Sequence, residues 1–87
     1  MKLYLEPIQV QLATDQTPAR LVWRRRVYRV RGIEECWRYN GQWWTTPKLR
    51  GRFRCYYRLV VTTLGGTVLQ VEIYWEAGRW MLSRVGD

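Results

Sequence analysis

The sequence predicts a single small all-β domain, and three observations lead to that fold class. The chain has 87 residues, which leaves room for one domain and one modest core. Several runs alternate apolar and polar residues with the period of two that is typical of β-strands. No window carries the apolar stripe and the caps of an amphipathic helix. We therefore expect residues 1–87 to form one antiparallel curled sheet, or a partly closed barrel, of six or seven strands.

The C-terminal half contains the most regular alternation. Residues 53–61 place apolar side chains on one face and two arginines and a tyrosine on the other. After a glycine-containing turn signal at 64–67, residues 68–75 alternate again, with Glu72 expected among the exposed positions. A second turn leads into a short strand over 79–84. This half is predicted to be a three-stranded meander.

The first part of the chain is less regular. Residues 3–10 are β-prone but contain Pro7, which suits an edge position or a bulge. Two further β-prone runs, 21–23 and 27–30, flank three consecutive arginines. We place these arginines, 24–26, in or beside a tight turn.

The middle of the chain carries a strong hairpin signal. Residues 34–39 continue or follow the preceding β-prone run, and Asn40-Gly41 is typical of a type I′ turn. Residues 42–45 are predicted to return as a strand, and residues 48–52 to form a basic loop.

Positive charge is concentrated in one part of the chain. Of fifteen cations and seven acids, twelve cations and two acids lie between Arg20 and Arg58, so this segment has a net charge of +10 within a total of +8. Thirteen of the cations are arginine, whose planar guanidinium forks onto phosphate and stacks on aromatic rings. This balance indicates a polyanionic partner. The alternative is a surface that is merely well solvated.

Composition disfavours several other classes. The chain contains no histidine and no adjacent carboxylate pair suited to acid–base work, so we predict neither an enzyme nor a metal or cofactor site. It has no transmembrane stretch and no signal-peptide pattern, which predicts a cytoplasmic protein without a membrane partner. Cys36 and Cys55 are not in a CxxC motif; we expect free thiols, at least one of them largely buried.

Two constellations point to nucleic acid. Arginines alternating with aromatic residues on a strand are typical of single-strand binders, where cations follow phosphates and rings stack on bases. Trp43 and Trp44 are adjacent and face opposite ways on a strand, so at least one of them is expected to meet solvent or a partner. The alternatives are a cation–π ladder that only stabilises the sheet, and a solvated turn. The predicted phosphate-binding residues are Arg24, Arg25, Arg26, Arg50, Arg52, Arg54 and Arg58, and the predicted stacking residues are Trp43, Trp44 and Tyr56.

The pattern also carries a resemblance. Glu6-Pro7-Ile8, Trp43-Trp44, Arg54-Cys55-Tyr56-Tyr57 and Gly78-Arg79-Trp80 resemble a small bacterial family of unknown function. They are similar as well to the C-terminal end of the polymerase-like subunit of the bacterial mutagenesis complex, an inactive relative of Y-family DNA polymerases. The resemblance implies a DNA-repair or translesion-synthesis setting and an accessory role, with no catalytic residues.

Together these observations predict a non-enzymatic nucleic-acid-binding module that favours single-stranded or distorted DNA. The second hypothesis is a protein-interaction adaptor that docks on a replication or repair partner through Trp43 and Trp44.

Overall fold

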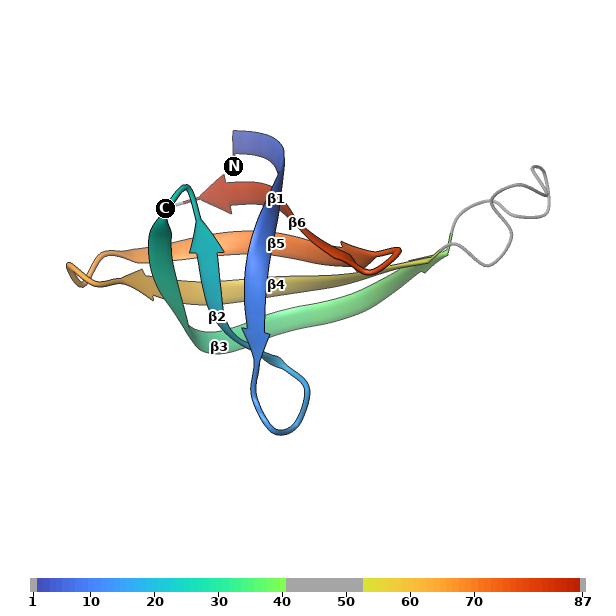
Figure 1. Cartoon of the computed structure of the whole chain (residues 1–87), viewed down its shortest axis with the longest axis horizontal. Coiled ribbons are helices and arrows are strands. Elements are labelled where there is room, and N and C mark those ends of the chain that lie inside the picture. Colours follow the sequence, from blue (N-terminus) through green and yellow to red (C-terminus); the bar gives the residue numbers. More distant parts are fainter. Residues whose placement is uncertain (1, 41–52, 87) are drawn as a thin grey trace.

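The computed structural model describes residues 2–40 and 53–86 and shows a closed barrel of antiparallel strands (Figure 1). The strands are β1 (Lys2–Leu12), β2 (Pro18–Trp23), β3 (Arg26–Asn40), β4 (Phe53–Thr63), β5 (Val68–Glu76) and β6 (Arg79–Gly86). Each strand pairs with the next, and β6 returns to pair with β1. The all-β prediction is confirmed, because the described residues contain six antiparallel strands and no helix. They accordingly contain no helix that could cross a bilayer.

Tight turns connect most of the strands. The pair Trp23↔Arg26 closes a two-residue turn between β2 and β3, and Glu76↔Arg79 closes another between β5 and β6. The turn between β4 and β5 contains Gly65 and Gly66, as predicted. The C-terminal meander is therefore confirmed. The predicted Asn40-Gly41 turn, the strand at 42–45 and the basic loop at 48–52 lie wholly or partly outside the described residues.

The core fills the inside of the barrel. Leu59, Val61 and Ile73 are fully buried, and Leu21 and Leu82 are nearly so. Partly buried aromatic side chains pack against this cluster from several strands. The space left among the lining side chains is about 10 Å³, which is at most the size of one water molecule. The interior therefore offers no chamber for a ligand, and any binding site on the described residues is on the outside.

The predicted irregularity in β1 is present beside Pro7. The register against β6 shifts between Leu3 and Glu6, and Leu5 takes a positive φ of 54°. Pro7 itself pairs with Met81 of β6. Glu6, at the edge of this bulge, pairs with Arg24 in the turn that follows β2.

One burial prediction is wrong, and another holds only in part. Glu72 is predicted to be exposed, but only 7% of its surface is exposed to solvent. Arginines from β4 and β6 lie over it. Cys36 and Cys55 are free, as predicted, yet Cys36 is exposed and Cys55 only half-buried. The reason is that β2 pairs with β3 only over 26–29, so the β3–β4 pair extends beyond the barrel here (Figure 1).

Candidate nucleic-acid interface

Several arginines of the described residues are already paired with carboxylates. These ion pairs join Arg24 to Glu6 at 2.6 Å, Arg54 to Glu76 at 2.8 Å, Arg58 to Glu35 at 3.1 Å and to Glu72 at 3.3 Å, and Arg84 to Glu72 at 3.7 Å. Three of these arginines, Arg24, Arg54 and Arg58, are among the predicted phosphate-binding residues. In each case a phosphate would have to compete with a carboxylate that the fold holds in place.

Strand register arranges the outer face of β3, β4 and β5 in rows. One row places Trp37 beside Tyr56 and Tyr56 beside Tyr74. The Trp37 and Tyr56 rings are stacked with centroids 5.1 Å apart, and the Tyr56 and Tyr74 rings are tilted at 5.2 Å. Tyr56 therefore already has aromatic neighbours on both sides, and its hydroxyl accepts a hydrogen bond from Arg54 Nη1 at 3.1 Å.

A second row is made of alternating charges. Glu35, Arg58, Glu72 and Arg84 lie opposite one another on β3, β4, β5 and β6. The Arg58 guanidinium lies 5.7 Å from the Trp37 ring, and its Nε is buried without a hydrogen-bond partner among the described residues. Cross-strand pairs of opposite charge stabilise a sheet. This face corresponds to the stabilising cation–π ladder that the sequence left open as an alternative.

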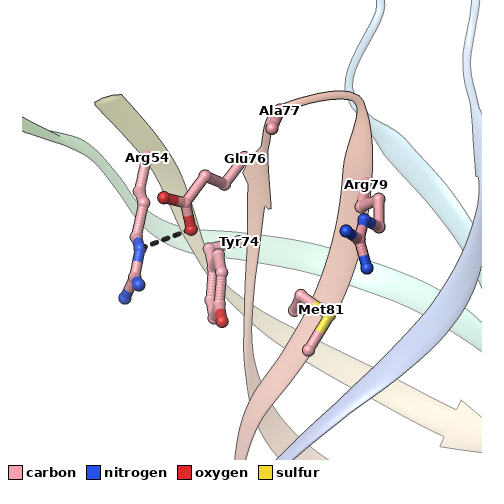
Figure 2. A pocket seen from close by; sticks show the side chains of 6 residues that line it. All are labelled: Arg54, Tyr74, Glu76, Ala77, Arg79 and Met81. Atoms are coloured by element: carbon pink, nitrogen blue, oxygen red, sulfur yellow. Dashed lines mark hydrogen bonds and ion pairs between the residues drawn. The ribbon is translucent and has the colours of Figure 1, made fainter. Parts of the chain in front are cut away.

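A hollow of about 400 Å³ borders this face at the turn between β5 and β6 (Figure 2). Arg54 lies over the Tyr74 ring at 4.7 Å and points to Glu76, while Arg79 lines the hollow from β6. The hydrogen bond to Tyr56, together with Glu76, raises the pKa of Arg54 above its usual range. The Arg54 guanidinium thus already has partners within the chain, Tyr56 and Glu76.

The end of the barrel where β2 turns into β3 has the opposite character. Arg20 and Arg29 lie directly opposite each other on β2 and β3, and Arg25 and Arg26 follow at the turn. No carboxylate of the described residues lies within 4.0 Å of these four guanidinium groups. Like charges that face each other across two strands destabilise the pairing. Arg20 and Arg29 are therefore a like-charge pair without an ion-pair partner among the described residues, and we refer to Arg20, Arg25, Arg26 and Arg29 together as the arginine cluster.

Two hollows that share lining residues lie beside the arginine cluster. One, of about 420 Å³, is lined in part by Arg20 and Arg29, and the other, of about 590 Å³, in part by Arg25 and Arg26. Residues of the turn between β4 and β5 complete both of them. The arginine cluster therefore borders concave surface that is open to a ligand.

The turn that carries Arg25 is also strained. Arg24 and Arg25 have φ values of 51° and 64°, the left-handed region that a type I′ turn requires and that asparagine or glycine usually occupies. The corresponding turn between β5 and β6 uses Ala77 and Gly78. Non-glycine residues held in this region cluster at functional sites. The sequence had placed these arginines at a turn, and that prediction is confirmed.

Arg24 differs from its neighbours because β1 clamps it. Its Nε and Nη2 donate to the two oxygens of Glu6 at 3.1 and 2.6 Å, and the Trp23 indole N–H donates to the same carboxylate at 3.0 Å. The Arg24 guanidinium also lies 4.7 Å from the Trp23 ring. The Arg24 hydrogen bonds, followed by that of Trp23, lower the pKa of Glu6. Arg24 therefore anchors the turn, while Arg25 has no ion-pair partner among the described residues.

The structure brings the predicted residues together only in part. Arg24, Arg25 and Arg26 lie at one end of the barrel, whereas Tyr56 and Arg58 lie in the aromatic and charged rows and Arg54 contacts the aromatic row. Arg50, Arg52, Trp43 and Trp44 lie outside the described residues. The candidate site that sequence reasoning missed is the pair Arg20 and Arg29. The sequence carries one signal for this pair. A two-residue turn at Arg24-Arg25 fixes the register of β2 against β3, and that register places Arg20 opposite Arg29.

The whole chain, residues 1–87, matches a domain of unknown function, DUF6504. The protein belongs to the DUF6504 family. No curated protein and no solved structure matches it. Membership in DUF6504 agrees with the predicted resemblance to a family of unknown function, and it assigns no activity to any residue. The link to the mutagenesis complex stays a hypothesis.

Proposed function

We propose that the protein is a non-enzymatic module that binds DNA, and that the arginine cluster is its phosphate-binding surface. The observation that carries the proposal is the cross-strand pair of Arg20 and Arg29, two cations held face to face with no carboxylate of the described residues between them. The repair or translesion-synthesis setting rests on the sequence resemblance alone.

The cost of the arginine cluster supports an anionic ligand. Like charges directly opposite each other on paired strands are destabilising, and the repulsion grows as the two guanidinium groups approach. A phosphate between the two guanidinium groups reverses the sign of that interaction. Arginine also forms paired hydrogen bonds with phosphate oxygens, so the gain is directional as well as electrostatic.

The arrangement of several cations favours a polymer over a single anion. The arginine cluster extends from the β2–β3 turn, at Arg25, along both strands to Arg20 and Arg29. Two hollows follow the same path. A polyanion can contact several of these arginines at once and release a counterion for each phosphate neutralised.

Salt dependence of oligonucleotide binding tests the proposal. Fluorescence anisotropy with labelled single- and double-stranded oligonucleotides should show affinity falling steeply between about 50 and 200 mM salt. Replacing Arg20 and Arg29 together with alanine should reduce the slope of log K against log salt by about two on duplex DNA. The matched control replaces Arg54 and Arg58, which carboxylates already neutralise; the slope should change by less than about one.

A second variant separates binding from folding. Arg25→Asn removes one charge but suits the left-handed turn, so it should raise stability by about 1 kcal/mol while it weakens binding. A reduced slope for the Arg54 and Arg58 double variant but not for Arg20 and Arg29 would assign the site to the aromatic and charged rows instead. If the unmodified protein binds no oligonucleotide even at low salt, the proposal fails and the adaptor hypothesis replaces it.

A further inference from the structure

The turn between β4 and β5 presents an apolar side chain to solvent. Leu64 is 93% exposed, the highest value among the large apolar residues that the structure describes. Burial of a leucine side chain is a substantial part of what drives folding and binding, so this residue contributes almost nothing to the fold. A hydrophobic side chain that is exposed at the tip of a turn is suited to insertion into a partner.

Hydrogen bonds hold the tip that carries Leu64. The Thr63 N–H donates to the Thr67 carbonyl at 2.9 Å, and the Gly66 N–H donates to the Thr63 carbonyl at 3.0 Å. The Thr67 N–H donates to Thr63 Oγ1 at 3.1 Å, and Gly66 supplies the positive φ, 88°, that the turn needs. The tip is thus ordered before any ligand binds, which lowers the entropy lost on insertion.

Leu64 lies beside both parts of the arginine cluster. It lines the hollow that contains Arg20 and Arg29, and it also lines the hollow that contains Arg25 and Arg26. An apolar residue close to cations suits a duplex groove, because bases whose stacked faces are apolar lie between two rows of phosphates. In the minor groove, proteins combine arginines with inserted leucine, isoleucine or phenylalanine side chains that partly unstack one base step.

We propose that Leu64 is a wedge that enters a base step of duplex DNA from the minor groove while the arginine cluster contacts the phosphates on both sides. This inference rests on the proposed function and specifies its ligand. Because partial unstacking is the main cost of insertion, the protein prefers duplexes whose stacking is already disrupted by a mismatch or a bulge.

A membrane surface is the other partner that combines anionic charge with an apolar layer. The structure favours DNA, because Leu64 is the single apolar residue of a tip otherwise made of glycines and threonines, residues 63–67. One such side chain gives weak membrane insertion, and stable attachment to a bilayer needs a larger apolar area.

The test compares duplexes that differ at one step. A labelled duplex of about 20 base pairs carries either full pairing or a central mismatch, with 2-aminopurine beside that position. We expect the unmodified protein to bind the mismatched duplex about tenfold more tightly and to increase 2-aminopurine fluorescence. Leu64→Ala should abolish both effects and leave the salt slope unchanged, whereas Leu64→Met, a side chain that also inserts, should preserve them. Thermal unfolding of both variants should match the unmodified protein, because the Leu64 side chain makes few contacts.

The outcomes separate the wedge from the proposed function. Salt-dependent binding that is equal on both duplexes and insensitive to Leu64→Ala overturns the wedge and leaves the DNA-binding module in place. Absence of binding to every oligonucleotide overturns both proposals. Tighter binding to vesicles that contain anionic lipid than to either duplex, lost in Leu64→Ala, would assign the tip to a membrane.

Discussion

Replacing Glu72 with glutamine tests whether the alternating charges on the outer face stabilise the barrel. The Glu72 side chain is 9% exposed and lies between Arg58 Nη2 at 3.3 Å and Arg84 Nε at 3.7 Å. The matched control is Glu35→Gln, because Glu35 also pairs with Arg58, at 3.1 Å, but is 59% exposed. Both variants remove a negative charge from Arg58, but Glu72 is more buried and also pairs with Arg84.

The expected magnitudes follow from that difference. Removing one member of a buried ion pair costs about 3–5 kcal/mol when the remaining charge is fully enclosed. Here Arg58 is 32% exposed and keeps Glu35, so we expect Glu72→Gln to cost about 2 kcal/mol. An exposed pair contributes between zero and about 1 kcal/mol, which bounds the loss for Glu35→Gln. In a domain of this size, the predicted losses lower Tm by about 10 °C and by a few degrees, respectively.

Urea unfolding followed by tryptophan fluorescence measures both variants. A double-mutant cycle with Arg58→Met should give a coupling energy above about 1 kcal/mol for Glu72 and below about 0.5 kcal/mol for Glu35. Equal and small losses for the two variants would refute the reasoning, because they would show that burial of Glu72 adds nothing to its interaction with Arg58.

The remaining predictions concern the core, acid stability and the thiols. Leu59→Ala should lower the free energy of unfolding by about 2–5 kcal/mol in urea, because Leu59 is fully buried and its loss leaves a cavity. The Arg24 hydrogen bonds lower the pKa of Glu6 below its ordinary value of 4.5, so its stabilising effect is present above that pH and is lost as the pH falls. Glu6→Gln should therefore flatten the loss of Tm on acidification below about pH 4.5, whereas an unchanged acid profile would contradict the clamp. Cys36 should react with a thiol reagent faster than Cys55 in the native protein, and a denaturant should make the two rates equal.

Local signals account for the elements that were predicted well. Period-two alternation predicts the strands over 53–61 and 68–75, and glycine or consecutive polar residues predict the turns between strands. The turn at Arg24-Arg25 could be located because β-prone runs flank it. Each of these features depends on a few neighbouring residues, so a sequence is sufficient to find them.

Closure of the barrel and the burial of Glu72 depend on pairing between distant segments. β1 meets β6 from the other end of the chain, and no local pattern indicates that Leu3 lies opposite Arg84. Alternation alone places Glu72 on a polar face, which is correct, but its burial comes from long arginine side chains on two neighbouring strands. Such cover is a property of the assembled sheet.

The sequence by itself determined that the chain is all-β, strongly basic and rich in arginine, because these properties follow from composition and short-range periodicity. Only the tertiary structure decided which of the described arginines pair with a carboxylate and which do not. Register places Glu72 between Arg58 and Arg84, and the same kind of register places Arg20 against Arg29. A slip of one residue would move each of these side chains to the other face of its strand. Pairing between strands therefore decides how charges are distributed over the surface, and this distribution cannot be read from the number of charged residues in the sequence.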